Sequence, residues 1–168
     1  MALIKVKSYM VRKISINQVD YIRNDVLLYV SEEHQYSILL CQKIREGFRK
    51  EIDIKRIKRY ADWFFETYLN PLITHEEQFV FPVIGMKNPR VKRALANHRR
   101  LRRLFNQTID LNKALNYIEE ELQQHVSYEQ RVVFNEFENK ASETDLAIIK
   151  NNIQKKIFED NLEDTFWV

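Results

Sequence analysis

Cysteine, glycine and proline are all scarce in this sequence of 168 residues, which contains one cysteine, two glycines and three prolines. The single cysteine, Cys41, excludes an internal disulfide and any metal site built from several cysteines. So few glycines and prolines, beside many leucines, isoleucines, glutamates and lysines, favour long helices over a sheet. A chain of this length can bury a sizeable core, so we expect one all-α domain.

Long apolar runs and a strong excess of one charge are also missing. No apolar stretch is long enough to cross a membrane, and basic residues interrupt the N-terminus, so we expect neither a transmembrane helix nor a signal peptide. The net charge is only +3 with both signs interspersed, which argues against a nucleic-acid-binding protein. The basic run at residues 99–103 is interpreted as a solvated helix face. These features predict a cytoplasmic protein with no nucleic-acid or membrane partner.

The spacing of apolar residues predicts four long helices, a short fifth helix and an irregular N-terminal arm. We place the arm at residues 1–22 and the domain at residues 23–168, with weak alternation extending to residue 29. Asn-Pro at residues 70–71 predicts a kink or break, and the apolar end of the chain, residues 164–168, is expected to dock on the helices. Short connections favour an up-down-up-down four-helix bundle. The expected N-caps of the five helices are Ser31, Asp53, Asn88, Asp110 and Ser142.

Histidine is the other scarce residue, and its placement is informative. Only four histidines are present, and His34, His98 and His125 each fall on the apolar stripe of a predicted helix. Glu129 lies four residues after His125, so that an imidazole and a carboxylate share one face of a helix. Nitrogen and oxygen donors that converge in this way suit iron, manganese or zinc.

Polar side chains on apolar stripes need an explanation, because a buried carboxylate costs several kcal/mol unless it is paired or binds a metal. A single histidine in such a position is usually a core residue with a satisfied hydrogen bond. Five polar residues on four different stripes are harder to explain in that way. The sequence therefore predicts a metal site inside the bundle, with the ligands His34, Glu76, His98, His125 and Glu129.

Four segments carry a resemblance to a known family. They are residues 31–45, which begin Ser-Glu-Glu-His, residues 76–82, Glu-Glu-Gln-Phe-Val-Phe-Pro, residues 94–105, and residues 125–131, His-Val-Ser-Tyr-Glu-Gln-Arg. From about residue 22 to residue 168 the chain resembles a hemerythrin-like (HHE cation-binding) domain, and its ending, Asp-Thr-Phe-Trp, resembles a bacterial branch of that family.

The resemblance implies a non-haem di-iron centre bridged by carboxylates. It makes His34, His98 and His125 the imidazole ligands, and Glu76 and Glu129 the bridging carboxylates. Members of the family bind oxygen, respond to oxygen or nitric oxide, or handle iron. Oxygen or nitric oxide is therefore the small-molecule partner that the resemblance implies.

Two positions depart from the family pattern. The second helix of the family carries His-x-x-x-Glu, whereas Leu72 stands four residues before Glu76 and cannot bind a metal. His75 is the candidate substitute, although an undistorted helix aims it about 100° away from Glu76. Arg102 stands where the oxygen-carrying branch has a further histidine, so oxygen carriage is disfavoured.

The expected function follows from this incomplete ligand set. The centre is predicted to be atypical, either mononuclear or with one tight and one weak iron site. The alternative is a metal-free helical bundle that acts as a protein-interaction module with an unknown protein partner. A ferritin-like di-iron site is disfavoured because no glutamate precedes a histidine by three residues. No phosphate-binding loop and no nucleophile–base pair is visible, so enzymatic activity is left undecided and is not favoured.

Overall fold

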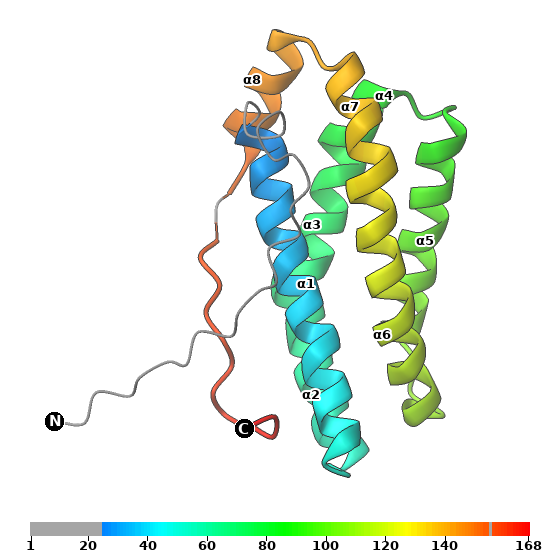
Figure 1. Ribbon diagram of the computed structural model, residues 1–168, viewed down its shortest axis with the longest axis vertical. Helices are drawn as coiled ribbons and strands as arrows, with labels where there is room; N and C mark the ends of the chain where they lie inside the picture. The colour runs from blue at the N-terminus through cyan, green and yellow to red at the C-terminus, as the bar shows by residue number, and fades with distance from the viewer. Residues whose placement is uncertain (1–24, 155) are drawn as a thin grey trace, which may run out of the picture.

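A computed structural model describes residues 25–154 and 156–168, and every regular element within these residues is helical (Figure 1). The all-α prediction is therefore confirmed for this part of the chain. The arm predicted at residues 1–22 lies outside the described residues. None of the described helices combines the length and the apolar character that a membrane span requires.

Helix α1 (Asp25–Arg49) begins earlier than the sequence predicted. Ser31 lies inside this helix instead of capping it, and residues 25–30 are helical instead of irregular, so both predictions are wrong. The reason is tertiary. Val26, Leu27 and Val30 are buried in an apolar cluster with residues of the other long helices, and this packing stabilises the helix before Ser31.

The second long helix runs from Ile54 to Ile84 and changes its winding along the way. It consists of α2 (Ile54–Phe64), η2 (Phe65–Leu69), α3 (Asn70–His75), η3 (Glu76–Val80) and α4 (Phe81–Ile84), in which η marks a π-helical turn. Asp53 caps its start as predicted, because the Asp53 side chain accepts hydrogen bonds from the amides of Lys55 and Arg56.

The helix does not end at Asn70-Pro71. The turn before the proline is π-helical, and the amide of Asn70 bonds to the carbonyl of Phe65. Pro71 has no amide that could bond to the carbonyl of Thr67. That carbonyl instead accepts a hydrogen bond of 3.2 Å from Nζ of Lys156, near the C-terminus. A change of winding and an outside donor thus replace the break that the proline signalled.

The third and fourth long helices are α5 (Pro89–Phe105) and the continuous run α6 (Leu111–Tyr128), η4 (Glu129–Val133) and α7 (Phe134–Lys140). Asn88 caps α5 as predicted, because its side chain accepts a hydrogen bond of 2.8 Å from the amide of Arg90. Asp110 occupies the N-cap position of α6 in a left-handed conformation, with φ 51°, and its side chain makes no capping hydrogen bond. Asp110 is therefore at the predicted N-cap position, but the predicted capping hydrogen bond of its side chain is absent.

The short helix α8 (Glu143–Asn152) opens with the predicted capping box of Ser142 and Asp145. The chain end docks on the helices, as predicted. Phe166 is buried there, and the guanidinium of Arg56 donates to both carboxylate oxygens of Asp164, at 2.9 and 2.6 Å.

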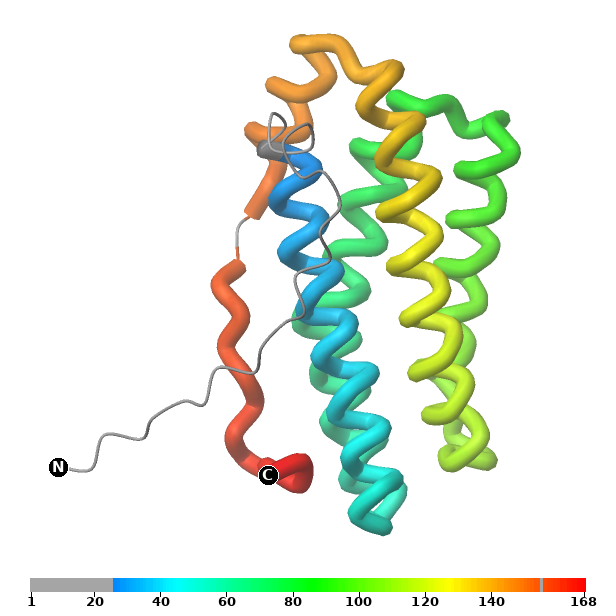
Figure 2. The backbone as a smooth tube through the Cα atoms, in the orientation of Figure 1, coloured from blue at the N-terminus to red at the C-terminus, as the bar shows by residue number. Residues whose placement is uncertain are grey.

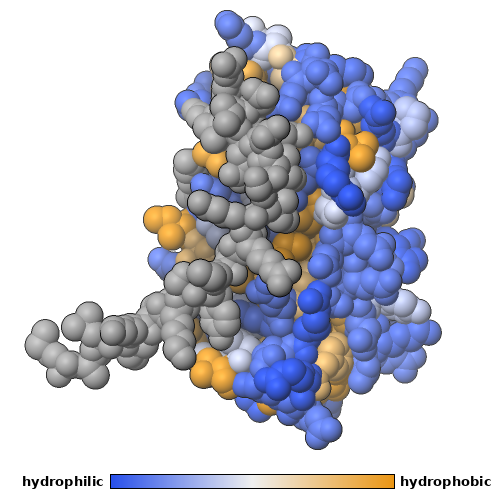
Figure 3. Space-filling view, viewed as in Figure 1, coloured by the Kyte–Doolittle hydropathy of each residue, from blue (hydrophilic) through white to orange (hydrophobic). Residues whose placement is uncertain are grey.

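Figure 1 shows the four long helices side by side, with the chain reversing its direction from each one to the next and α8 at one end. Helix α6 packs against α1 and α5, and α1 packs against α2. In Figure 2 the C-terminal segment runs beside α1, where Lys43 and Lys50 bond to it. The surface in Figure 3 is mostly hydrophilic where the structure describes it, and its apolar patches are small and separate.

Two apolar clusters fill the interior. One contains residues of α2, η2 and the adjoining parts of α1, α5 and α6. The other contains residues of α4, α7 and α8 and the first turns of α1 and α5. On each long helix the predicted metal-ligand positions lie near the point where residues of one cluster give way to residues of the other. The site is therefore a polar layer enclosed by apolar packing on both sides.

Candidate metal centre

Five polar side chains meet in this layer, and each is less than 4% exposed. The long helices supply all of them, and the sequence analysis named all of them as ligands. The structure thus brings the predicted set together, while the binding of a metal stays a prediction. The five residues and their elements are His34 on α1, Glu76 on η3, His98 on α5, His125 on α6 and Glu129 on η4.

Both glutamates stand at the first position of a π-helical turn. The carbonyl of Glu76 accepts from the amide of Phe81, and the carbonyl of Glu129 accepts from the amide of Phe134, in each case five residues along. The extra residue in each turn shifts the phase of the positions that follow. Such π turns are frequent at functional sites. Sequence periodicity gave no sign of these turns, after which Phe81 is buried and Phe79 is only partly buried.

The two carboxylates lie side by side, and each directs one oxygen to each side of the centre. On one side, Nε2 of His34 lies 3.2 Å from Oε1 of Glu76 and 3.1 Å from Oε2 of Glu129. We call this the His34 side.

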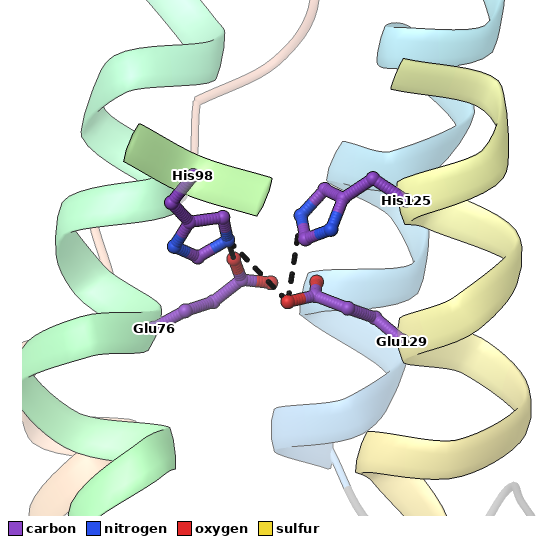
Figure 4. Close-up of side chains that lie close together, drawn as sticks. All are labelled: Glu76, His98, His125 and Glu129. Carbon is purple, nitrogen blue, oxygen red and sulfur yellow. Dashed lines mark ion pairs between the residues drawn. The ribbon is translucent and has the colours of Figure 1, made fainter. Parts of the chain in front are cut away.

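The opposite oxygens face two imidazoles (Figure 4). Nε2 of His98 lies 3.5 Å from Oε2 of Glu76 and 3.4 Å from Oε1 of Glu129. Nε2 of His125 lies 3.5 Å from the same oxygen of Glu129. We call this the His98/His125 side.

These contacts leave the polar atoms without proper hydrogen bonds. All four carboxylate oxygens of Glu76 and Glu129, and Nε2 of His98, are buried with no hydrogen-bond partner among the described residues. Buried polar atoms without partners are costly and rare. One donor atom from each of Glu76, His98, His125 and Glu129 lies within 4.8 Å of the others. Two nitrogens and two oxygens in this arrangement fit a metal ion, so the structure shows a buried cluster that can hold one.

The carboxylates shift the pKa values of two imidazoles in the metal-free cluster. Burial lowers the pKa of His34, but the neighbouring carboxylates of Glu129 and Glu76 outweigh burial and raise it to about 9. Burial also lowers the pKa of His98, but the carboxylates of Glu129, Glu76 and Glu77 together outweigh burial and raise this pKa well above its ordinary value. Without a metal, both imidazoles are therefore protonated on both nitrogens and positively charged at neutral pH.

The remaining pair behaves differently. Burial lowers the pKa of His125 to about 4, so this imidazole is neutral and one of its nitrogens has a lone pair that can bind a metal. Burial raises the pKa of Glu129, but the three neighbouring histidines outweigh it and hold that pKa well below its ordinary value. A metal entering the cluster would therefore meet an ionised Glu129 and a neutral His125, and would have to displace protons from the other two imidazoles.

Leu72 and His75, the two positions in question on the second helix, lie outside the cluster. Leu72 is 4% exposed and belongs to an apolar cluster, so a hydrocarbon side chain occupies the position where the resemblance implied a ligand. The ring of His75 packs against Tyr29 and Phe79, with centroids 6.0 and 5.1 Å apart. Neither nitrogen of His75 has a hydrogen-bond partner among the described residues.

One contact at the centre was missed by the sequence analysis. Nδ1 of His98 lies 2.9 Å from Oε1 of Glu77, and the same oxygen accepts a hydrogen bond of 2.7 Å from Arg102. We had interpreted Arg102 as part of a solvated basic face, which is wrong for this residue because it is half-buried and paired. The only sequence signal was the acidic residue beside Glu76, and such pairs are common on helix surfaces.

No protein-family model, curated protein or solved structure matches this chain. The assignment of the site therefore depends on its own geometry.

Proposed function

We propose that the protein is a hemerythrin-like, non-haem iron-binding protein with an up-down-up-down four-helix bundle. The observation that carries the proposal is the buried carboxylate pair of Glu76 and Glu129, whose four oxygens make no hydrogen bond to the described residues and face three imidazoles from three helices. Nitrogen and carboxylate donors with open positions suit iron(II). The buried layer also excludes bulk water from the bound metal.

The two sides of the centre are unequal, so we propose one tight metal position. The His98/His125 side offers two imidazoles and two carboxylate oxygens. The His34 side offers one imidazole and two oxygens, and Leu72 fills the place of a further ligand. A second metal on the His34 side would therefore be held weakly or not at all.

The proposed role is the handling of iron or the sensing of oxygen or nitric oxide. Bound iron would supply the affinity for such a small molecule. The protein residues hold the metal, exclude water, and keep His125 neutral through burial. No enzymatic step is proposed.

The test is a metal count. The protein is loaded with iron(II) without oxygen, freed of unbound metal and analysed for iron per chain, and crystals are measured for anomalous scattering. We expect about one iron per chain, on the His98/His125 side. Two tightly bound irons would contradict the inequality of the two sides but not the family assignment. Absence of iron, manganese and zinc from the loaded protein would contradict metal binding.

The alternative function is a metal-free interaction module, and the observation that favours it is the apolar Leu72 at a ligand position. In that case, protonated His34 and His98 would balance the buried carboxylates without any metal. Titration with iron, manganese and zinc while the melting temperature is followed distinguishes the two functions. A melting temperature that does not respond to any metal would favour the interaction module.

A further inference from the structure

His98 differs from the other two imidazoles of the centre at its outer nitrogen. Nδ1 of His34 and Nδ1 of His125 are buried without a hydrogen-bond partner among the described residues. Nδ1 of His98 instead lies 2.9 Å from the carboxylate of Glu77. Within the described part of the chain, His98 is therefore the one imidazole of the three with a contact at its outer nitrogen, Nδ1, as well as at the nitrogen that faces the carboxylate pair.

The carboxylate of Glu77 is held by Arg102, which in turn contacts Asn70. Arg102, one turn after His98 on α5, donates to the Glu77 oxygen that contacts His98, at 2.7 Å. Nε of Arg102 also lies 3.4 Å from Oδ1 of Asn70, on α3. The side chains of Glu77 and Arg102 are only 25% and 29% exposed, so water screens this pair less than it screens a surface ion pair.

Adjacent residues on the second helix therefore approach His98 at opposite nitrogens. Glu76 lies near Nε2 on the inner side, and Glu77 lies at Nδ1 on the outer side. A carboxylate at Nδ1 keeps the proton on that nitrogen, leaves the lone pair of Nε2 for a metal, and fixes the orientation of the ring. The ring is further held by stacking on Phe81, with centroids 5.3 Å apart.

We propose that Glu77, anchored by Arg102, is a positioning residue that presents Nε2 of His98 to the metal and makes the His98/His125 side the preferred metal position. The inference deepens the proposed function and depends on it. It also gives Arg102 a role in the centre at a position where the resemblance implied only a lost ligand.

The test compares metal affinity in matched variants of the full chain. Glu77→Ala removes the acceptor, and Glu77→Gln keeps an acceptor oxygen but removes the charge. The control is Glu121→Gln, because Glu121 pairs with Arg100 of the same helix α5 but does not contact the centre. Cobalt(II) is the probe, since its visible spectrum reports the ligand geometry.

We expect cobalt affinity to fall by about 10–100-fold in Glu77→Ala, with a smaller loss in Glu77→Gln and none in Glu121→Gln. The visible spectrum should change in both Glu77 variants, which a merely structural pair would not cause. Circular dichroism and the melting temperature identify any misfolded variant, and Glu77→Gln, which keeps the side-chain volume, carries the comparison if Glu77→Ala does not fold.

A second measurement does not need a metal. In nitrogen-15 NMR spectra of the metal-free protein, the Nδ1 proton of His98 should be shifted downfield and exchange slowly, and this signal should disappear in Glu77→Ala. A wild-type protein that binds no cobalt, iron or zinc overturns both the proposed function and this inference. Metal binding in wild type with unchanged affinity and spectrum in both Glu77 variants overturns this inference alone.

Discussion

The two sides of the carboxylate pair share the same glutamates but differ in what surrounds them. The His98/His125 side has two imidazoles, and Glu77 contacts the outer nitrogen, Nδ1, of one of them, His98. The His34 side has one imidazole, whose Nδ1 has no partner among the described residues. Leu72, where the resemblance implies a further ligand, is buried among apolar residues. The difference shows that a bridging pair alone does not make two equal sites. In the proposed function, the number of imidazoles and the contact of Glu77 with His98 decide which side binds a metal firmly.

The largest effect is expected from Glu129→Gln, because Glu129 serves both sides. Metal affinity should fall by more than the roughly 100-fold that is typical for the loss of an outer partner. The metal-free protein should also lose about 3–5 kcal/mol of unfolding free energy, since two buried imidazoles lose a charged partner. Calorimetric titration and urea denaturation measure the two effects. A variant that binds metal as wild type does would show that the two sides are not joined by this carboxylate.

The pH dependence of metal binding gives the number of protons that a metal displaces from the imidazoles. Because the pKa values of His34 and His98 are raised, each imidazole must lose a proton to bind a metal at neutral pH, so affinity should rise with pH; the contribution of His34, if it takes part, levels off near pH 9. If metal occupies only the His98/His125 side, zinc affinity should rise about tenfold per pH unit, because one proton leaves. A slope near a hundredfold would show that the His34 side takes part as well.

The same raised pKa values affect the stability of the metal-free protein. A histidine whose pKa is raised on folding stabilises the fold fully below its unfolded pKa, near 6.5. For His34 this contribution is lost as the pH rises through about 9. His125 acts in the opposite sense, because its lowered pKa costs stability as the pH falls from about 6.5 towards 4. Chemical denaturation across this range should therefore show greatest stability near pH 6.5.

Leu72→His tests whether the His34 side lacks only a ligand. We expect iron content to rise from about one to about two per chain, because the added imidazole would give the His34 side a second nitrogen donor. Without metal, the variant should be about 1–3 kcal/mol less stable, since it places a polar ring in an apolar cluster. Leu72→Met is the control of similar volume. Unchanged iron content in Leu72→His would locate the defect of this side elsewhere.

The smallest effect is expected from His75→Gln. The His75 ring contacts Tyr29 and Phe79 and is not part of the cluster, so iron content and affinity should change by less than about twofold. The iron content of His75→Gln is measured in parallel with that of Leu72→His. A clear loss of iron would show that His75 moves into the centre when the metal binds, and would restore the substitution that the sequence left open.

Much of the site was predictable because its residues break a local pattern. His34, His98 and His125 stand on apolar stripes, and a histidine followed four residues later by a glutamate places both donors on one helix face. The caps at Asp53, Asn88 and Ser142 were equally local, because each side chain bonds to amides two or three residues along. The early start of α1 could not be predicted in this way, since packing against distant helices stabilises it.

The sequence by itself determined the helices, their polar positions and the absence of a histidine at position 72. Only the tertiary structure decided how these positions meet. It gave each carboxylate one oxygen for each side, placed two imidazoles on one side and one on the other, and brought Glu77 and Arg102 behind His98. The π turns at Glu76 and Glu129 also emerged only from the structure, because periodicity describes a regular helix and does not reveal where a turn contains an extra residue. Local spacing selects the donors, and contacts between helices set the geometry in which they can act together.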